Sequence, residues 1–583
     1  MTNTPRPQSG HRLLQRLSPQ KKFPGSKNCN HTKTMKIRNI VITQGIQSWV
    51  RRLAVPLAAF GMLVAQIPTV LLAANPAPNV IPAVREWRGE EGNFTVGANP
   101  KICVSPGSGG GLSGIAGTFQ RELGLVGINV TLETSDSPVA GDFHLTKDCR
   151  EAGLGSEGYL LNVGDSVRIS STMEAGIIHG MISVLQILQQ NKTVKIISKG
   201  VAKDYPRYQI RGQMLDPARS FIPLDRLKEI IRILGWYKYN ELHLHLTDLE
   251  GFRIESATYP GLASNPSYSR AEMSDLIRYA ARYGIQVMPE IEMPSHIGMT
   301  KYFGKDLCTT DYTGKYAEFN NMAFDFSKGS ITHPNGDDPK TSIYAISKNL
   351  IGENAALFPY GYFHIGGDEW PHWPPAIQSK TNEAVTVAAD SSPSQKAYAA
   401  SLGYSHSTDL YSRFVNFANA QARSNGKVTR MWSWDQHIQQ FLVKIDPNHE
   451  IVYDLWNYRP EEGGVAAYVK ANRKIVNCSP LYLYNDIGAC RPAWELYEKW
   501  TPNRFSTECY TSFSYMSEDI DPDYPNLLGA KAQNWGGASM KPRMQPLAEI
   551  LWCGSKQSAD YNAFCDRLKA IGEPVDDSAR NGK

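Results

Sequence analysis

Two adjacent carboxylates, Asp368 and Glu369, follow a Gly-Gly pair in the segment HIGGDEW at residues 364–370. The residues before the glycines, YFHI (362–365), predict a short strand, so both acids fall where a strand gives way to a loop. A carboxylic acid can protonate a glycosidic oxygen, and a second carboxylate across the bond ordinarily acts as nucleophile or base. The pair therefore points to acid–base chemistry of the kind that cleaves sugars.

The spacing of the two acids restricts this chemistry. Carboxylates that flank a scissile glycosidic bond lie on the order of 5 to 9 Å apart, whereas neighbouring side chains at a strand end diverge. A substrate with a 2-acetamido group removes the problem, because its own carbonyl oxygen can serve as the nucleophile. Glu369 is then the acid and later the base, while Asp368 orients the acetamido group and stabilises the positive charge that develops on it.

The elements that must position these acids repeat from Ile210 onward. Strand-like apolar runs alternate with helical patterns, which is typical of an α/β fold of the (β/α)8 TIM barrel type. We expect continuous, apolar strand interiors, because both faces of such a sheet are covered. The eight runs are QIRGQMLD, YNELHLHLTD, IQVMPEIEM, YFHIGGDE, VTRMWSW, EIVYDLW, KIVNCSP and LLGAKAQNW.

Acids and tryptophans collect at the carboxyl ends of these runs, and barrel enzymes build their active sites on that rim. Alone, an Asp-Glu pair is most often a helix cap or a solvated loop, and a tryptophan is most often core. Their shared placement on one rim favours a functional site. The residues are Asp216, Asp248, Glu292, Asp368, Glu369, Trp434, Trp456 and Trp535.

The chain before the barrel divides into three parts. Residues 1–74 are a basic stretch and an apolar run (53–74), typical of a secretory signal cleaved near Ala73 or Ala74, with Met35 as a second candidate start. If uncleaved, the same run is long enough for a membrane anchor. After a linker (75–83), residues 84–203 alternate apolar runs with turns and end in a helix over 175–190, which predicts a small α/β support domain. The barrel takes residues 204–583.

Composition limits the partners. The net charge of +5 is small for 583 residues, and residues 1–52 hold part of it, so no nucleic-acid-binding face is expected. Twelve tryptophans and 28 tyrosines suit a neutral ligand with flat apolar faces, such as a sugar. The chain has neither CxxC nor HExxH spacing, so we expect no metal site.

Export of the chain predicts disulfide bonds and N-linked glycans. One of the nine cysteines, Cys29, falls in the leader, which leaves eight. An even number of cysteines in an exported chain predicts disulfide bonds, whose pairing the sequence does not determine. Glycosylation sequons begin at Asn93, Asn129, Asn191 and Asn477, and Asn477 is the least favourable because it falls in a predicted barrel strand.

These motifs together resemble the β-N-acetylhexosaminidases of glycoside hydrolase family 20, from about Val84 to Trp552. HIGGDE is the most specific match, and RGQMLDPARSF (211–221), LHLHLTD (242–248) and PEIEMPSH (289–296) are similar to the family's first three barrel strands. EGYLLNVGDSVRISSTMEAGIIHGMISVLQIL (157–188) is similar to the end of its support domain.

The resemblance implies a secreted, retaining, substrate-assisted exo-hydrolase, which needs no cofactor. Its substrates would carry terminal β-linked GlcNAc or GalNAc, as in chitooligosaccharides, N-glycans or glycoconjugates. It also implies that Arg219 grips sugar hydroxyls, that tryptophans wall the pocket and that Tyr482 bonds the acetamido group. The walls would be Trp434, Trp456 and Trp535, and the supporting residues Asp248, Glu292, His296 and His364, of which His296 helps set the protonation of the acid.

The chain departs from the family pattern at four positions. Glu292 and Ser295 stand where the family has Asp and Gly, and Tyr484 and Gly537 stand where it has acids that hold distal hydroxyls of the terminal sugar. The two lost acids leave open a lacto-N-biosidase-like enzyme that releases a Gal-GlcNAc disaccharide. A catalytically silent glycan-binding protein is the third reading, against which the intact pair of adjacent acids argues. The oligomeric state stays open.

Overall fold

The computed structural model describes residues 74–108, 110–191, 193–370, 387–433, 444–456, 464–485, 490–509, 514–536 and 543–575. All of them belong to one unit that begins at Leu71. The predicted signal or anchor lies outside these residues. Within them, no helix combines the length and the apolar character needed to cross a membrane.

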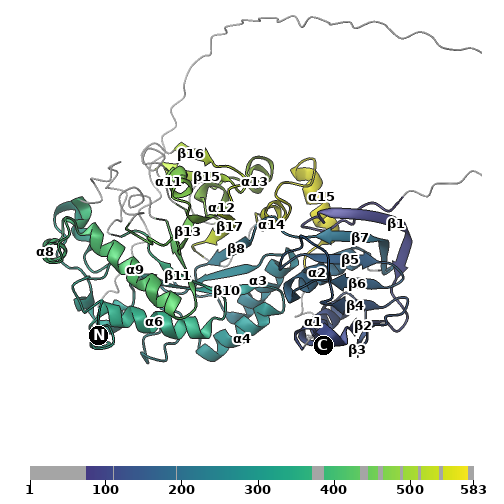
Figure 1. Cartoon of the computed structure of the whole chain (residues 1–583), viewed down its shortest axis with the longest axis horizontal. Helices are drawn as coiled ribbons and strands as arrows, with labels where there is room; N and C mark the ends of the chain where they lie inside the picture. Colours follow the sequence, from purple (N-terminus) through teal and green to yellow (C-terminus); the bar gives the residue numbers. More distant parts are fainter. Residues whose placement is uncertain are drawn as a thin grey trace, which may run out of the picture. The chain divides into compact units, whose positions relative to one another are not determined.

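A seven-stranded sheet forms the support domain, in the order β1-β7-β5-β6-β4-β2-β3 (Figure 1). Helix α2 packs on the strands β5, β6 and β7 on one side and on the barrel helix α3 on the other, which explains why it is apolar nearly all round. The strands are β1 (Glu86–Thr95), β2 (Lys101–Val104), β3 (Thr131–Thr134), β4 (Phe143–Thr146), β5 (Tyr159–Val163), β6 (Val167–Ser170) and β7 (Ile196–Asp204), and the helices are η1 (Pro106–Ser108), α1 (Gly111–Leu125) and α2 (Glu174–Gln190).

Eight parallel strands close the barrel in the order β10-β11-β12-β13-β14-β17-β8-β9, and each of the eight predicted runs supplies one of them. The predicted (β/α)8 barrel with a preceding support domain is therefore confirmed. The strands are β8 (Ile210–Leu215), β9 (Glu241–His245), β10 (Gln286–Met293), β11 (Tyr362–Gly366), β12 (Val428–Trp432), β13 (Val452–Leu455), β14 (Lys474–Asn477) and β17 (Leu527–Asn534).

The described connections between these strands carry the helices and one added hairpin, β15 (Arg504–Cys509) with β16 (Ser514–Asp519). Helices α3 and α9 are amphipathic. The longer helices are α3 (Leu224–Trp236), α4 (Arg270–Ala281), α6 (Ile343–Leu357), α8 (Pro393–Ser401), α9 (Thr408–Ser424), α14 (Met544–Cys553) and α15 (Tyr561–Ile571), and the shorter ones are α5 (Thr300–Phe303), η2 (Lys305–Leu307), η3 (Gly314–Phe319), α11 (Gly464–Lys470), α12 (Pro480–Leu483) and α13 (Ala493–Lys499).

The expectation of apolar strand interiors is wrong, because a charged network runs through the barrel. Arg430 donates from Nε to Asp454 at 2.9 Å and from Nη1 to Glu241 at 3.0 Å, and Lys531 also contacts Asp454. These side chains are fully buried. Buried charges persist when each one has a partner of opposite sign, and each of these charges has one, although Glu241 Oε1 makes no hydrogen bond with the described atoms.

The expected disulfides are not confirmed. Among the residues whose side chains are described, six cysteines are free thiols: Cys103, Cys149, Cys308, Cys478, Cys553 and Cys565. Asn477 is fully buried and its amide donates to the backbone carbonyls of Pro502 and Arg504 at 3.0 and 2.8 Å. A glycan cannot be attached to that side chain in the folded protein.

A buried carboxylate at the end of β7 joins the support domain to the barrel. Asp204 accepts hydrogen bonds from the Tyr159 hydroxyl at 2.7 Å, from Lys238 Nζ at 2.9 Å and from Trp552 Nε1 at 2.8 Å. Lys238 and Trp552 belong to the barrel, and all four side chains are inaccessible to solvent. The Lys238 cation therefore depends on a charge that the support domain provides.

Replacing Asp204 by Asn should destabilise the protein by about 3–5 kcal/mol, because it leaves Lys238 buried without its counter-charge. Urea unfolding followed by tryptophan fluorescence measures the change. Asp165→Asn is the matched control, since Asp165 pairs with Lys199 at 2.7 Å on the surface and is 82% exposed; it should leave the unfolding curve nearly unchanged. Equal curves for the two variants would contradict this role of Asp204.

Candidate active site

The catalytic turn, which we define as residues 366–369, has an unusual backbone. Gly366, Gly367 and Glu369 have positive φ values of 72°, 95° and 53°. A Cβ on Gly366 would lie 2.0 Å from the Glu292 carboxyl group, and one on Gly367 would lie 2.8 Å from a Met431 carbon. The positive φ values favour glycine at both positions, and a side chain there would also force the Glu292 carboxyl group or the Met431 methyl group to move.

The predicted acid lies beside a positively charged histidine. Glu369 Oε2 is 3.0 Å from His296 Nε2, and His296 Nδ1 is 3.4 Å from Asp248 Oδ1. Burial alone would lower the pKa of His296, but the carboxylates of Asp248 and Glu369 raise it well above its ordinary value. His296 is therefore an imidazolium that faces the carboxyl group of Glu369, whose side chain is 22% exposed.

Asp368 and Glu292 form a pair of buried acids behind the turn. Burial is the largest influence on Asp368, and the nearby acids Glu369 and Glu290 add to it, so its pKa rises to about 6 although His296 and His245 oppose the change. Burial and the charge of Asp368 raise the pKa of Glu292 well above its ordinary range. Two neighbouring carboxyls rarely both ionise, so Glu292 keeps its proton and Asp368 is the carboxylate at neutral pH.

Arg219 lies in the loop that follows β8, at the carboxyl end of the barrel strands. Its guanidinium donates to Asp216 at 2.8 Å, contacts Asp248 at 2.7 Å and lies over the Trp535 ring at 5.3 Å. The side chain is still 26% exposed. Nε also lies 3.9 Å from Glu250 Oε2, so acids and the indole fix a planar, partly exposed donor of a kind that suits vicinal sugar hydroxyls.

The predicted pocket walls are only partly described. Trp456 and Trp535 belong to one apolar cluster inside the barrel, together with Trp432, which the sequence did not single out. Trp535 also stands edge-on to His245, with ring centroids 5.5 Å apart. Trp434 and Gly537 lie outside the described residues.

Tyr482 does not join this cluster. It lies in α12, packs in the main core and faces the charged residues Glu495 and Arg504. Tyr484, rather than Tyr482, belongs to this cluster. Its ring is 6.1 Å from that of Trp535, and its backbone is bridged to Gln533 in β17. The segment LYLYND repeats tyrosine at two-residue spacing, so both tyrosines fit the motif, and Tyr484 is the one that lies beside Trp535.

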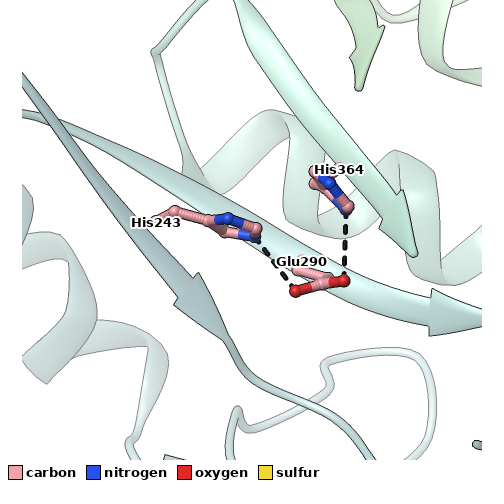
Figure 2. A group of neighbouring side chains, drawn as sticks. All are labelled: His243, Glu290 and His364. Atoms are coloured by element: carbon pink, nitrogen blue, oxygen red, sulfur yellow. Dashed lines mark ion pairs between the residues drawn. The ribbon is translucent and has the colours of Figure 1, made fainter. Parts of the chain in front are cut away.

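Figure 2 shows a carboxylate that the sequence did not single out, Glu290 of β10, between His243 of β9 and His364 of β11. Glu290 lies 3.0 Å from His243 Nε2 and 3.2 Å from His364 Nδ1. It also accepts from Trp432 Nε1 at 2.6 Å and bonds His245 Nδ1 at 2.6 Å. Period-two alternation in LHLH and PEIE is the sequence signal, since it turns these polar side chains to one face of each strand.

His243, Glu290 and His364 include donor atoms of the types that bind zinc, but the Nδ1 atoms of both histidines already have other partners. Lys531 Nζ lies 2.7 Å from His243 Nδ1, and the Gly366 N–H donates to His364 Nδ1 at 3.0 Å. A metal ion would also have to enter beside the Lys531 ammonium. The group is better explained as a hydrogen-bonded network that supports the turn above it.

Paired acids on the carboxyl-end rim of a (β/α)8 barrel are an arrangement found in glycoside hydrolases. Comparison with models of protein families identifies which family of glycoside hydrolases this chain matches. The model of the glycosyl hydrolase family 20 catalytic domain matches residues 208–555, and that of the family's domain 2 matches residues 77–205. The chain belongs to glycoside hydrolase family 20.

Individual relatives and solved structures are consistent with this family assignment. A β-hexosaminidase of Vibrio furnissii is 31% identical over 54% of this chain, and the match spans about half, 55%, of that protein. β-Hexosaminidase subunit A2 of Dictyostelium discoideum is 30% identical over 78% of each chain. The structure of the family 20 exo-β-N-acetylglucosaminidase of Vibrio harveyi superimposes on this chain with a TM-score of 0.64. The match covers 85% of this chain and 78% of that protein at 21% identity, and it supports the assignment of the fold.

The pKa of about 6 for Asp368 predicts an acid limb in the pH profile. Below pH 6 Asp368 becomes neutral and can no longer stabilise positive charge on the substrate, so kcat/KM should fall about tenfold per pH unit. The limb should disappear in Asp368→Asn, whose activity is low at every pH. A profile of kcat/KM from pH 4 to 8, with a leaving group that does not titrate, provides the measurement. A wild-type rate that stays constant from pH 6 to 4 would contradict the role of Asp368.

Proposed function

We propose that this protein is an exo-acting β-N-acetylhexosaminidase that removes terminal β-linked GlcNAc or GalNAc with retention, using the substrate's acetamido group as nucleophile. The closeness of the two acids carries the proposal. One oxygen each of Asp368 and Glu369 and one nitrogen of His296 lie within 4.8 Å of one another. Two carboxylates that flank a glycosidic bond stand about 5 Å or more apart. Asp368 is therefore suited to support an internal nucleophile.

The reaction follows from these positions. Glu369 donates its proton to the glycosidic oxygen while the acetamido oxygen attacks the anomeric carbon, which expels the leaving sugar and forms an oxazolinium ion. The Asp368 carboxylate accepts the acetamido N–H and stabilises the positive charge. Glu369, now a carboxylate, takes a proton from water, whose oxygen attacks the anomeric carbon and reopens the ring. Two inversions give overall retention.

The pocket contacts of the terminal sugar follow the same assignment. Trp535 and Trp456 offer apolar ring faces, and Arg219 supplies donors for hydroxyls. Tyr484, rather than Tyr482, is the candidate partner of the acetamido group, because it neighbours Trp535. An acid, Asp486, then follows the tyrosine at the two-residue spacing of the family pattern, which weakens the case for a disaccharide-releasing enzyme.

The natural setting is a second part of the proposal. The basic and apolar leader supports export, and the substrates would then be chitooligosaccharides, N-glycans or glycoconjugates outside the cytoplasm. A catalytically silent glycan-binding protein is disfavoured, because such a protein has no use for a strained turn that holds an acid against an imidazolium.

A panel of chromogenic β-glycosides with one common leaving group tests the activity. GlcNAc and GalNAc glycosides should be hydrolysed, whereas the glucose analogue, which lacks the internal nucleophile, should be inert or nearly so. Efficient cleavage of the Gal-GlcNAc glycoside with negligible action on the GlcNAc glycoside would replace the single-sugar assignment with the disaccharide one. Comparable hydrolysis of the glucose glycoside would rule out substrate assistance.

Glu369→Gln keeps the shape of the acid but cannot donate its proton. Hydrolysis of GlcNAc glycosides with poor leaving groups should fall by about 100- to 10,000-fold, with a smaller loss for leaving groups that need little protonation. Rates for a series of aryl glycosides of graded leaving-group basicity measure this. Glu229→Gln, on the exposed side of α3, is the control and should behave like the wild type. An equal loss across the series would remove Glu369 from the acid role.

A further inference from the structure

Three consecutive peptide groups of the catalytic turn are held by side chains from outside it. The Gly367 N–H donates to Glu292 Oε1 at 3.0 Å, the Gly367 carbonyl accepts from the Tyr411 hydroxyl, and the Asp368 carbonyl accepts from Ser295 Oγ at 2.5 Å. Backbone with positive φ at several residues persists when the surroundings over-determine it. These side chains, rather than the turn's own preferences, fix its shape.

Ser295 acts on the peptide that leads directly into the acid. Its hydroxyl holds the carbonyl of Asp368, and the nitrogen of the same peptide group belongs to Glu369. The next residue, His296, bonds the carboxyl group of Glu369 at 3.0 Å. One short segment therefore holds Glu369 at both ends, through its backbone and through its carboxyl group. Ser295 itself is 4% exposed.

Glu292 acts at the start of the turn. Its carboxyl group occupies the space that a side chain on Gly366 would need, and Oε2 has no hydrogen-bond partner among the described atoms. The side chain is 1% exposed and lies beside Asp368, so it is suited to a neutral carboxyl group that accepts from Gly367 through Oε1. A charge there would compete with the one that Asp368 must carry.

Both residues are departures from the family pattern, which has Asp and Gly at these positions, and neither of those side chains could make the same contacts. Aspartate is one methylene shorter than Glu292, and glycine has no hydroxyl. We propose, building on the proposed hydrolase function, that Ser295 and Glu292 act together as positioning residues, which fix the catalytic turn so that Glu369 meets His296 and Asp368 meets the acetamido group.

Ser295→Ala tests the hydroxyl. It should lower kcat for GlcNAc glycosides about 3- to 10-fold, the equivalent of one lost hydrogen bond, with KM changed less than about twofold. The loss should be largest for poor leaving groups, since Glu369 is the group displaced. Ser347→Ala is the matched control, because Ser347 is also buried and its hydroxyl, in α6, has no hydrogen-bond partner among the described atoms. Wild-type kcat for every leaving group in Ser295→Ala would overturn the assignment.

Two changes of Glu292 separate its shape from its charge. Glu292→Gln keeps an uncharged acceptor for Gly367, so kcat and the acid limb of the pH profile should stay within about threefold and 0.3 pH units of the wild type. Glu292→Asp withdraws the acceptor and should lower kcat about 3- to 10-fold. A Gln variant as impaired as the Asp variant would show that Glu292 works through its charge or its proton, which overturns a positioning role.

A crystal structure of Ser295→Ala gives a readout that does not depend on activity. The contact between Glu369 and His296 should lengthen beyond hydrogen-bond distance, and its survival at 3.0 Å would contradict the proposal. A wild-type protein inert on the whole glycoside panel would refute the proposed function alone. The structural comparison would still decide whether Ser295 holds the turn.

Discussion

The active end of the barrel depends on the contacts that the Glu290 carboxylate makes. This carboxylate is fully buried, and the rings of His243, His245, His364 and Trp432 converge on it. These rings belong to β9, β11 and β12, so one side chain of β10 ties four consecutive strands of the barrel together. Removing a carboxylate from such a site would leave several buried N–H groups without an acceptor, which costs more than the bonds themselves contribute.

Acidic and basic side chains alternate along a path from Glu290 to the rim of the barrel. His245 lies between Glu290 and Asp248, and these carboxylates outweigh the effect of burial and raise the pKa of His245 to about 10. Asp248 then faces the His296 imidazolium, which in turn faces Glu369. Each contact joins groups of opposite sign, so Glu369 is connected to Glu290 in the barrel interior through four contacts. A site of this kind is prepared before substrate arrives.

The sequence predicted the barrel well because each strand is an apolar run that ends in a polar or aromatic rim residue. It did not predict α1 of the support domain, whose four glycines resemble a loop although Leu112, Ile115, Phe119 and Leu123 recur at helical spacing. The inward charges were hidden inside runs that looked apolar, because ion pairing depends on strands far apart in the chain. The two tyrosines of LYLYND fit one motif equally well, and only packing against Trp535 distinguishes them.

Adjacent acids on one turn fit the proposed mechanism, in which the nucleophile arrives with the substrate. An enzyme that supplies both carboxylates needs them on different strands, so that a sugar ring fits between them. Here one turn carries both, and its sharp course requires two glycines and a left-handed Glu369. That backbone is unfavourable alone and is held by Glu292 of β10, Ser295 just after β10 and Tyr411 of α9. The precision of the site therefore resides in the contacts between the turn and its neighbours, and changes in those contacts at Glu292 and Ser295 alter its support while leaving the reacting groups unchanged.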